Sequence, residues 1–260
     1  MEGLGGELGL LEPGRLGVVV LGALVAGFIT GFAGFGTGLV ASGFWFAALP
    51  ASAVPPLIVI ASVAGQLVGL ARVRHAVEWP RLGPFLVTGC LGVPIGVHAL
   101  SQSSPTLLRL TVGVFLVTYA LFQLSGLARL SVGSWGGRTA DGIVGAAGGF
   151  LGGFAGLSGP LPLVWLQLRG GPSAAQRAIY QPFNLVILAL ACAGMAYSGL
   201  VDRFVLAVAA WSVPFTLIGA AVGARLYLAI SEQLFKTIVL MLLLASGCML
   251  ALPSLLAWAR

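Results

Sequence analysis

The stretch Thr30–Gly38, TGFAGFGTG, interrupts an apolar run in which a helix would otherwise continue. A similar phrase, GGFAGLSGP, occupies residues 152–160. An unbroken helix over residues 16–49 would be about 50 Å long at roughly 1.5 Å per residue, well beyond the roughly 30 Å hydrocarbon core of a bilayer. The chain is therefore expected to turn at the first phrase, and the second phrase predicts the same turn again.

The composition is that of a membrane protein. Of the 260 residues, 58% are hydrophobic and only 8% are charged, whereas soluble domains carry about 25% charged residues. Apolar runs near the length of a membrane span recur along the chain. We therefore predict an all-α polytopic protein whose partner is the lipid bilayer. The net charge of +6 forms no basic cluster, so nucleic acid is not an expected partner.

No cofactor or metal is expected from the sequence. The two histidines and three cysteines show no metal-ligand spacing. The chain also contains no P-loop for ATP, so transport driven by a gradient is the default expectation.

The two phrases belong to an apparent internal duplication. Gly27-Phe28 aligns with Gly149-Phe150 at a shift of 122 residues, and the alignment continues in order over about a hundred residues. Such duplication is frequent in transporters. We predict a short tail at 1–15, a first transmembrane repeat at 16–128, a loop at 129–139 and a second repeat at 140–260. Each repeat would hold a glycine-broken helix pair and three further helices, giving eight to ten membrane segments in all.

The orientation of the repeats depends on how each broken pair lies in the membrane. If each pair enters and leaves on the same side, nine of the 13 Lys and Arg residues share one side. The positive-inside rule then makes the repeats inverted, with both termini outside. If each pair crosses once, the split is eight to five and the repeats are parallel. The inverted arrangement is the preferred prediction.

The glycine phrases allow two interpretations. Gly27, Gly31 and Gly34 form a smooth face that lets helices pack closely. The residues that follow, with Thr37 and Ser158 as helix N-caps and Pro160 in a first turn, predict that a helix restarts inside the membrane. Such a helix start exposes N–H groups at the positive end of the helix dipole, and these groups need protein, water or an anion.

Polar side chains in the next span of each half would complete an anion site between the two breaks. The alternative for these side chains is ordinary hydrogen bonding between helices. The candidate substrate-binding residues, with Gln66 as a weaker member, are Gly36, Thr37, Gly38, Ser62, Gln66, Ser158, Gly159, Gln181 and Asn184.

The twin phrases, together with GVPIGVHALSQSSPTLLRL (92–110) and GAAVGARLYLAISEQLFKTIV (219–239), resemble the sulfite exporter TauE/SafE family of permeases. The resemblance runs from about Leu16 to Leu252. It implies a non-enzymatic exporter of sulfite or organosulfonates such as sulfoacetate in a bacterial inner membrane, working by secondary alternating access, with a homodimer left open. The phrases depart from the family in lacking an unbroken glycine triplet, which leaves the substrate open.

Three alternatives remain from the sequence. One is a permease for another small anion, and another is a non-transporting assembly subunit. The third is an intramembrane serine protease, because Gly156–Gly159 spells GLSG. A protease would need a histidine to activate Ser158, and neither His75 nor His98 is placed at mid-helix.

Overall fold

In the computed structural model, the described residues are 12–73, 78–127, 130–133, 135–226 and 232–258, and all their regular structure is helical. The predicted all-α class is confirmed. The helices are, in chain order, α2 (Pro13–Ala33), α3 (Thr37–Ala48), the 3₁₀ turn η1 (Ala51–Ala53), α4 (Val54–Val73), α5 (Trp79–Gln102), α6 (Pro105–Leu124), α7 (Gly137–Ala155), α8 (Pro160–Arg169), α9 (Ser173–Tyr197), α10 (Arg203–Leu226) and α11 (Glu232–Trp258).

Seven of the described helices, α2, α4, α5, α6, α9, α10 and α11, are long and apolar enough to cross a membrane. α3 is apolar but has only 12 residues, or about 18 Å at roughly 1.5 Å per residue. α7 and α8 fall outside the set of seven. The chain is thus a multi-pass membrane protein, and its described residues hold seven candidate spans besides the shorter helices of the broken pairs.

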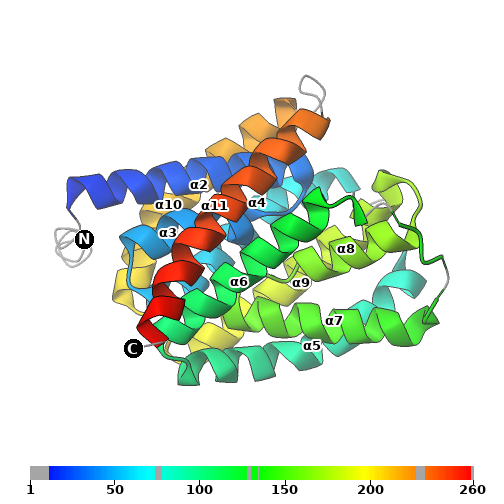
Figure 1. The fold of residues 1–260 in the computed structure, drawn as a ribbon, viewed down its shortest axis with the longest axis horizontal. Helices are drawn as coiled ribbons and strands as arrows, with labels where there is room; N and C mark the ends of the chain where they lie inside the picture. The colour runs from blue at the N-terminus through cyan, green and yellow to red at the C-terminus, as the bar shows by residue number, and fades with distance from the viewer. Residues whose placement is uncertain (1–11, 74–77, 128–129, 134, 227–231, 259–260) are drawn as a thin grey trace.

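Helices from the two halves of the chain are interleaved. Figure 1 shows α2 and α10 together along one edge, α5 and α7 along the opposite edge, and α6 and α11 in front. α2 and α7 therefore each pack most closely against a helix of the other half, and α4 packs against α9. The order of a broken pair followed by three helices occurs twice, but the duplication and its inverted orientation stay predictions.

Glycines allow the α2–α10 pair to approach closely. A Cβ added to Gly27 or Gly31 would overlap the main chain of Thr216 or Ala220, and one added to Gly219 would overlap that of Leu24. The packing interpretation of these glycines is confirmed, because only residues without side chains let two backbones meet in this way.

The α5–α7 pair is built in the same manner. A Cβ on Gly149 would overlap the carbonyl oxygen of Gly89, and one on Gly96 would overlap that of Phe150. Both breaks are therefore anchored by close helix crossings to the opposite half of the chain.

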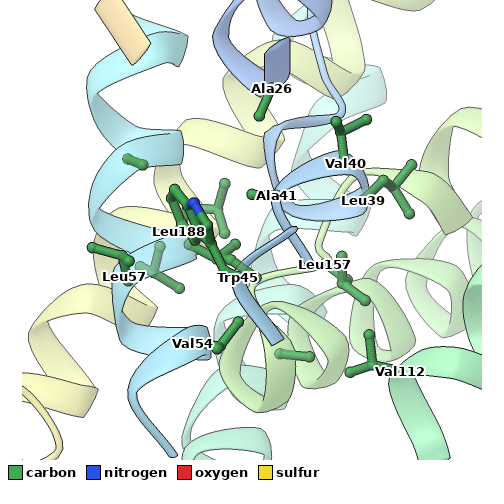
Figure 2. Close-up of a cluster of buried hydrophobic side chains, with 14 of the residues drawn as sticks. Ala26, Leu39, Val40, Ala41, Trp45, Val54, Leu57, Val112, Leu157 and Leu188 are labelled. Carbon is green, nitrogen blue, oxygen red and sulfur yellow. The ribbon is translucent and has the colours of Figure 1, made fainter. Parts of the chain in front are cut away.

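α3 folds back along α2, so the first broken pair is a helical hairpin. The indole Nε1 of Trp45 donates to the carbonyl oxygen of Val19 over 3.0 Å, and Trp45 is fully buried. Figure 2 shows the core around this helix, with Leu39 and Trp45 of α3 and Leu57 of α4 among its side chains. The hairpin places the start of α3 deep inside the protein.

Candidate functional site

Both phrases end one helix and begin another, as predicted. α2 is closed by Gly34 with φ of +81°, and α7 by Gly156 with φ of +72°. These left-handed conformations favour glycine, which has no Cβ to clash with the following carbonyl. α3 and α8 then restart at Thr37 and Pro160.

The predicted N-caps are wrong. Gly36, with φ of +111°, is the N-cap of α3, and Gly159 is the N-cap of α8. Thr37 is instead the first helical residue, and its hydroxyl forms a hydrogen bond with that of Thr30. Pro160 does occupy the first turn of α8, where its missing N–H costs nothing. Neither helix start is closed by a side-chain cap.

The two breaks meet in the centre of the protein. A Cβ on Gly38 would lie 2.7 Å from the carbonyl oxygen of Gly156 and 3.0 Å from the side chain of Leu157. Figure 2 shows Leu157 close to α3, although it belongs to the second phrase. Two segments that are 122 residues apart in sequence therefore form one site.

A central cavity of about 20 Å³ lies between the breaks, α4 and α9. Its volume accommodates roughly one water molecule. Eight of the nine predicted site residues line it: Gly36, Thr37, Gly38, Ser62, Gln66, Ser158, Gly159 and Asn184.

Ser158 and Asn184 form the polar wall of the central cavity. The Ser158 hydroxyl donates to Oδ1 of Asn184 over 2.9 Å, and both side chains are buried. This bond fixes the orientation of the amide and leaves its two N–H groups for another acceptor. A Cβ on Gly159 would lie 2.6 Å from Nδ2 of Asn184, so the glycine makes room for the amide.

α4 contributes two further buried polar side chains to the lining of the cavity. Ser62 is 2% exposed and Gln66 is 3% exposed, and neither Ser62 Oγ nor Gln66 Oε1 has a hydrogen-bond partner among the described residues. An unpaired buried polar atom costs roughly 1–3 kcal/mol. Two such atoms in one cavity are expected to be satisfied by a bound water molecule or by a ligand.

The two helix starts present different numbers of N–H groups. The first hydrogen bond at the start of α3 runs from the N–H of Val40 to Gly36, which leaves Thr37, Gly38 and Leu39 without a partner in the helix. In α8 the corresponding bond runs from Leu163 to Gly159. Because residues 160 and 162 are prolines, only Leu161 in that first turn keeps a donor.

Gln181 lies outside the central cavity. Its amide packs directly against Gly34, the residue that closes α2. Two neighbours on the same helix hold the end of α2: Arg177 Nη2 donates to the carbonyl oxygen of Phe32 over 3.3 Å, and the Tyr180 hydroxyl donates to that of Ala33 over 2.8 Å. A cation and a hydroxyl at these carbonyls complement the negative end of the α2 dipole.

A second, larger cavity of about 150 Å³ adjoins the central one, and we call it the vestibule. Phe35, Gly36 and Leu39 line both cavities. Sequence reasoning missed the polar and charged residues of the vestibule, which include Tyr119, Gln123, Gln167, Arg177 and Lys236. The sequence did offer one usable signal of these residues, the spacing of Arg177 and Gln181 one helical turn apart. It offered none for the 2.9 Å hydrogen bond between Gln123 and Gln167, which joins α6 to α8.

The protease alternative is not supported. Ser158 donates its hydroxyl to an amide oxygen, which is not a base. His98 is exposed near the end of α5, far along the chain from the breaks, and His75 lies outside the described residues. The geometry around Ser158 provides no activated nucleophile.

The fold and site define a class: a multi-pass helical membrane protein in which two broken helices meet at a small neutral cavity. The chain belongs to the sulfite exporter TauE/SafE family, whose model matches residues 19–250. This confirms the resemblance seen in the sequence.

A curated relative in Cupriavidus necator, described as a probable sulfite/organosulfonate exporter TauE, is 27% identical to the chain over 236 residues. The match covers 86% of this chain and 89% of the relative. No solved structure matches the chain. Membership of this family makes the chain a membrane transporter of the sulfite exporter type.

Proposed function

We propose that the protein exports a small sulfur oxyanion, sulfite or an organosulfonate, across a bacterial inner membrane by alternating access. The observation that carries the proposal is the meeting of the two helix breaks at the central cavity, where Ser62 and Gln66 are buried without partners.

The central cavity offers the groups that an oxyanion needs. The start of α3 supplies up to three N–H groups at the positive end of its dipole. The Asn184 amide and the Ser62 hydroxyl supply further donors from α9 and α4. A sulfonate or sulfite group carries three oxygen acceptors and therefore suits several donors that converge from different helices.

The central cavity binds charge without a buried cation. Among the described residues that line it, none is charged. A neutral site avoids the desolvation of a fixed ion inside the membrane and binds an anion reversibly. Reversibility is required of a permease, because the substrate has to leave as well as enter.

The volume of the central cavity has a consequence for the cycle. At about 20 Å³ the cavity is too small for a sulfonate. The breaks therefore have to separate when substrate binds, which is the kind of motion that alternating access between two halves would supply.

The test is the thermal stability of the purified protein with a panel of anions, sulfite, sulfate, sulfoacetate, chloride and acetate, and with the zwitterionic sulfonate taurine. A ligand specific to the folded state adds about 2.7 kcal/mol at a hundredfold excess over its Kd. We expect a saturable rise with a sulfur oxyanion, and we expect Asn184→Leu to abolish it. Exposed Gln102→Leu, outside the central cavity, is the matched control and keeps the rise.

The outcomes separate the candidate substrates. A rise with chloride or acetate but not with sulfur oxyanions would assign the protein to another small anion. No rise with any anion, together with no flux of sulfite or taurine in proteoliposomes, would overturn the anion site. Export rather than uptake is checked by the direction of flux in vesicles of known orientation.

A further inference from the structure

The vestibule differs from the central cavity because cationic side chains line it. Arg177 at the start of α9 and Lys236 near the start of α11 both face it, and among the described residues that line it there is no Asp or Glu. The two cations come from helices that are far apart in sequence. Their convergence on one hollow is a feature of the fold rather than of one charged segment.

The vestibule is graded from an exposed rim to a buried floor. Ser173, the first residue of α9, is exposed, Arg177 is half-buried one turn deeper, and Tyr180 is buried. Next to Tyr180 lie Phe35 and Gly36, which are half-buried and also line the central cavity. The ring of Phe35 packs edge-on against Tyr180, with 5.8 Å between centroids.

We propose that the vestibule is a capture site that holds the transported anion at Arg177 and Lys236 before it passes Phe35 into the central cavity. This inference rests on the proposed export function, and it adds a second anion site on the same path. The ligand chemistry is an oxyanion group with a short organic tail. The cations face the oxyanion group, while Phe32, Leu240 and Leu243 supply apolar surface for the tail.

The position of the site fits the proposed direction of transport. Under the inverted arrangement, Arg177 and Lys236 lie on the side that holds nine of the 13 basic residues, which is the predicted cytoplasmic side. An exporter collects its substrate there. A cationic mouth raises the local concentration of anions and speeds their association.

The first test measures the charge of the vestibule without assuming any transport. Gln176→Cys, at the vestibule wall, is introduced after Cys90, Cys192 and Cys248 are replaced by serine or alanine. The protein in neutral detergent is then labelled with two methanethiosulfonates, one bearing a sulfonate and one a trimethylammonium group. The thiolate attacks the reagent sulfur, a disulfide forms and sulfinate leaves. We expect the sulfonate reagent to react faster, relative to a free thiol in solution.

The charge variants decide the role of the two cations. The measured quantity is the labelling rate of the sulfonate reagent divided by that of the trimethylammonium reagent. Lys236→Gln lowers this ratio by about fivefold, because one nearby unit charge is removed. Lys236→Arg keeps the charge and the wild-type ratio. Arg177→Lys keeps the ratio, and Arg177→Gln lowers it where the protein folds. Arg109→Gln is the matched control: Arg109 aligns with Lys236 at the 127-residue shift but lies over the ring of Phe46, outside the vestibule. A ratio unaffected by Lys236→Gln overturns the proposal.

The second test distinguishes the source of the anion. Ethanesulfonate should slow labelling of Gln176→Cys in a saturable way, and this protection should persist in Asn184→Leu, which loses the central site. Protection by phosphatidylglycerol but not by ethanesulfonate would assign the cations to a lipid headgroup and overturn the proposal. Loss of transport in Asn184→Leu with protection intact supports both sites. Protection without any flux in the wild type keeps the capture site but defeats the export function.

Discussion

The α2–α3 break lies between the central cavity and the vestibule, whereas the α7–α8 break is covered by apolar side chains of α4. Tyr180 and Arg177 bind the last carbonyls of α2. At the corresponding place in the other half, a Cβ on Gly156 would lie 2.5 Å from Ile58 and 3.3 Å from Val59. Ile58 aligns with Tyr180 at the 122-residue shift.

Two similar phrases thus receive different partners at the ends of α2 and α7, although both breaks line the central cavity. The polar contacts leave the first break next to a hollow of about 150 Å³. The apolar contacts close the second break with fully buried Ile58 and Val59. Under the proposed mechanism this is the arrangement of a state with access from one side, and the opposite state would require Ile58 to leave Gly156.

The largest expected effect concerns the close helix crossings at glycine, which both breaks share. Gly31→Leu would place a side chain against the main chain of Ala220, whose carbonyl oxygen lies 2.0 Å from an added Cβ. Gly153→Leu would do the same at Val93, whose carbonyl oxygen lies 2.4 Å from an added Cβ. Both variants should fail to yield a monodisperse folded protein, because backbones in contact cannot yield space to a side chain. The measurement is yield and melting temperature by fluorescence-detected gel filtration.

Gly17→Leu is the control in the same helix, because nothing lies within 4 Å of a Cβ at Gly17. It should fold like the wild type. If Gly31→Leu folds normally while Gly153→Leu does not, the two helix crossings differ in how closely they pack. The difference between the two breaks would then have to be explained by these crossings.

The next effect concerns the donors at the two helix starts. Replacing Leu39 by its α-hydroxy acid turns one backbone amide into an ester and removes its N–H without changing the side chain. We expect anion affinity to fall about tenfold or more, because a hydrogen bond to a charged group contributes about 1.5–3 kcal/mol. Affinity is measured by the anion-dependent shift in melting temperature.

The same replacement at Leu161 is the matched test in the second break. Leu161 holds the lone donor in the first turn of α8 but does not line the central cavity, so anion affinity should change less than twofold. Equal losses at both positions would mean that the two helix starts bind the anion symmetrically, contrary to the difference in their prolines.

The sequence was informative where a single residue type determines the backbone. Gly34 and Gly156 end their helices because glycine tolerates positive φ, and Pro160 begins one because proline fits the first turn. Eight site residues were placed together because the duplication implied that two helix breaks would meet. The N-caps failed for a related reason: Gly36 takes the cap position itself and displaces Thr37 into the helix.

The rest depended on tertiary structure. Apolar composition does not determine which glycine face meets which, so the pairing of α2 with α10 had no local signal. Gln181 and Asn184 are three residues apart on α9 and nevertheless contact different parts of the breaks, at Gly34 and Gly159. The vestibule draws on six helices, α2, α3, α6, α8, α9 and α11, and its polar members were visible in the sequence as scattered Arg, Lys, Tyr and Gln.

The smallest effect tests the contacts that hold the first break. Tyr180→Phe removes the hydroxyl that donates to Ala33 over 2.8 Å but keeps the ring that packs against Phe35. Stability should fall by about 1 kcal/mol, which is the usual net contribution of one hydrogen bond.

Tyr197→Phe, on the same helix but 96% exposed, is the control and should leave stability unchanged. The measurement is unfolding in a mixed-micelle denaturant titration. A loss in both variants would point to a general effect on α9. No loss in Tyr180→Phe would mean that apolar packing holds each break, by the Tyr180 ring at the first and by Ile58 at the second. Both breaks would then be held by side-chain packing, and the Tyr180 hydroxyl would not distinguish them. The access of anions to the first break would then depend on Arg177 alone.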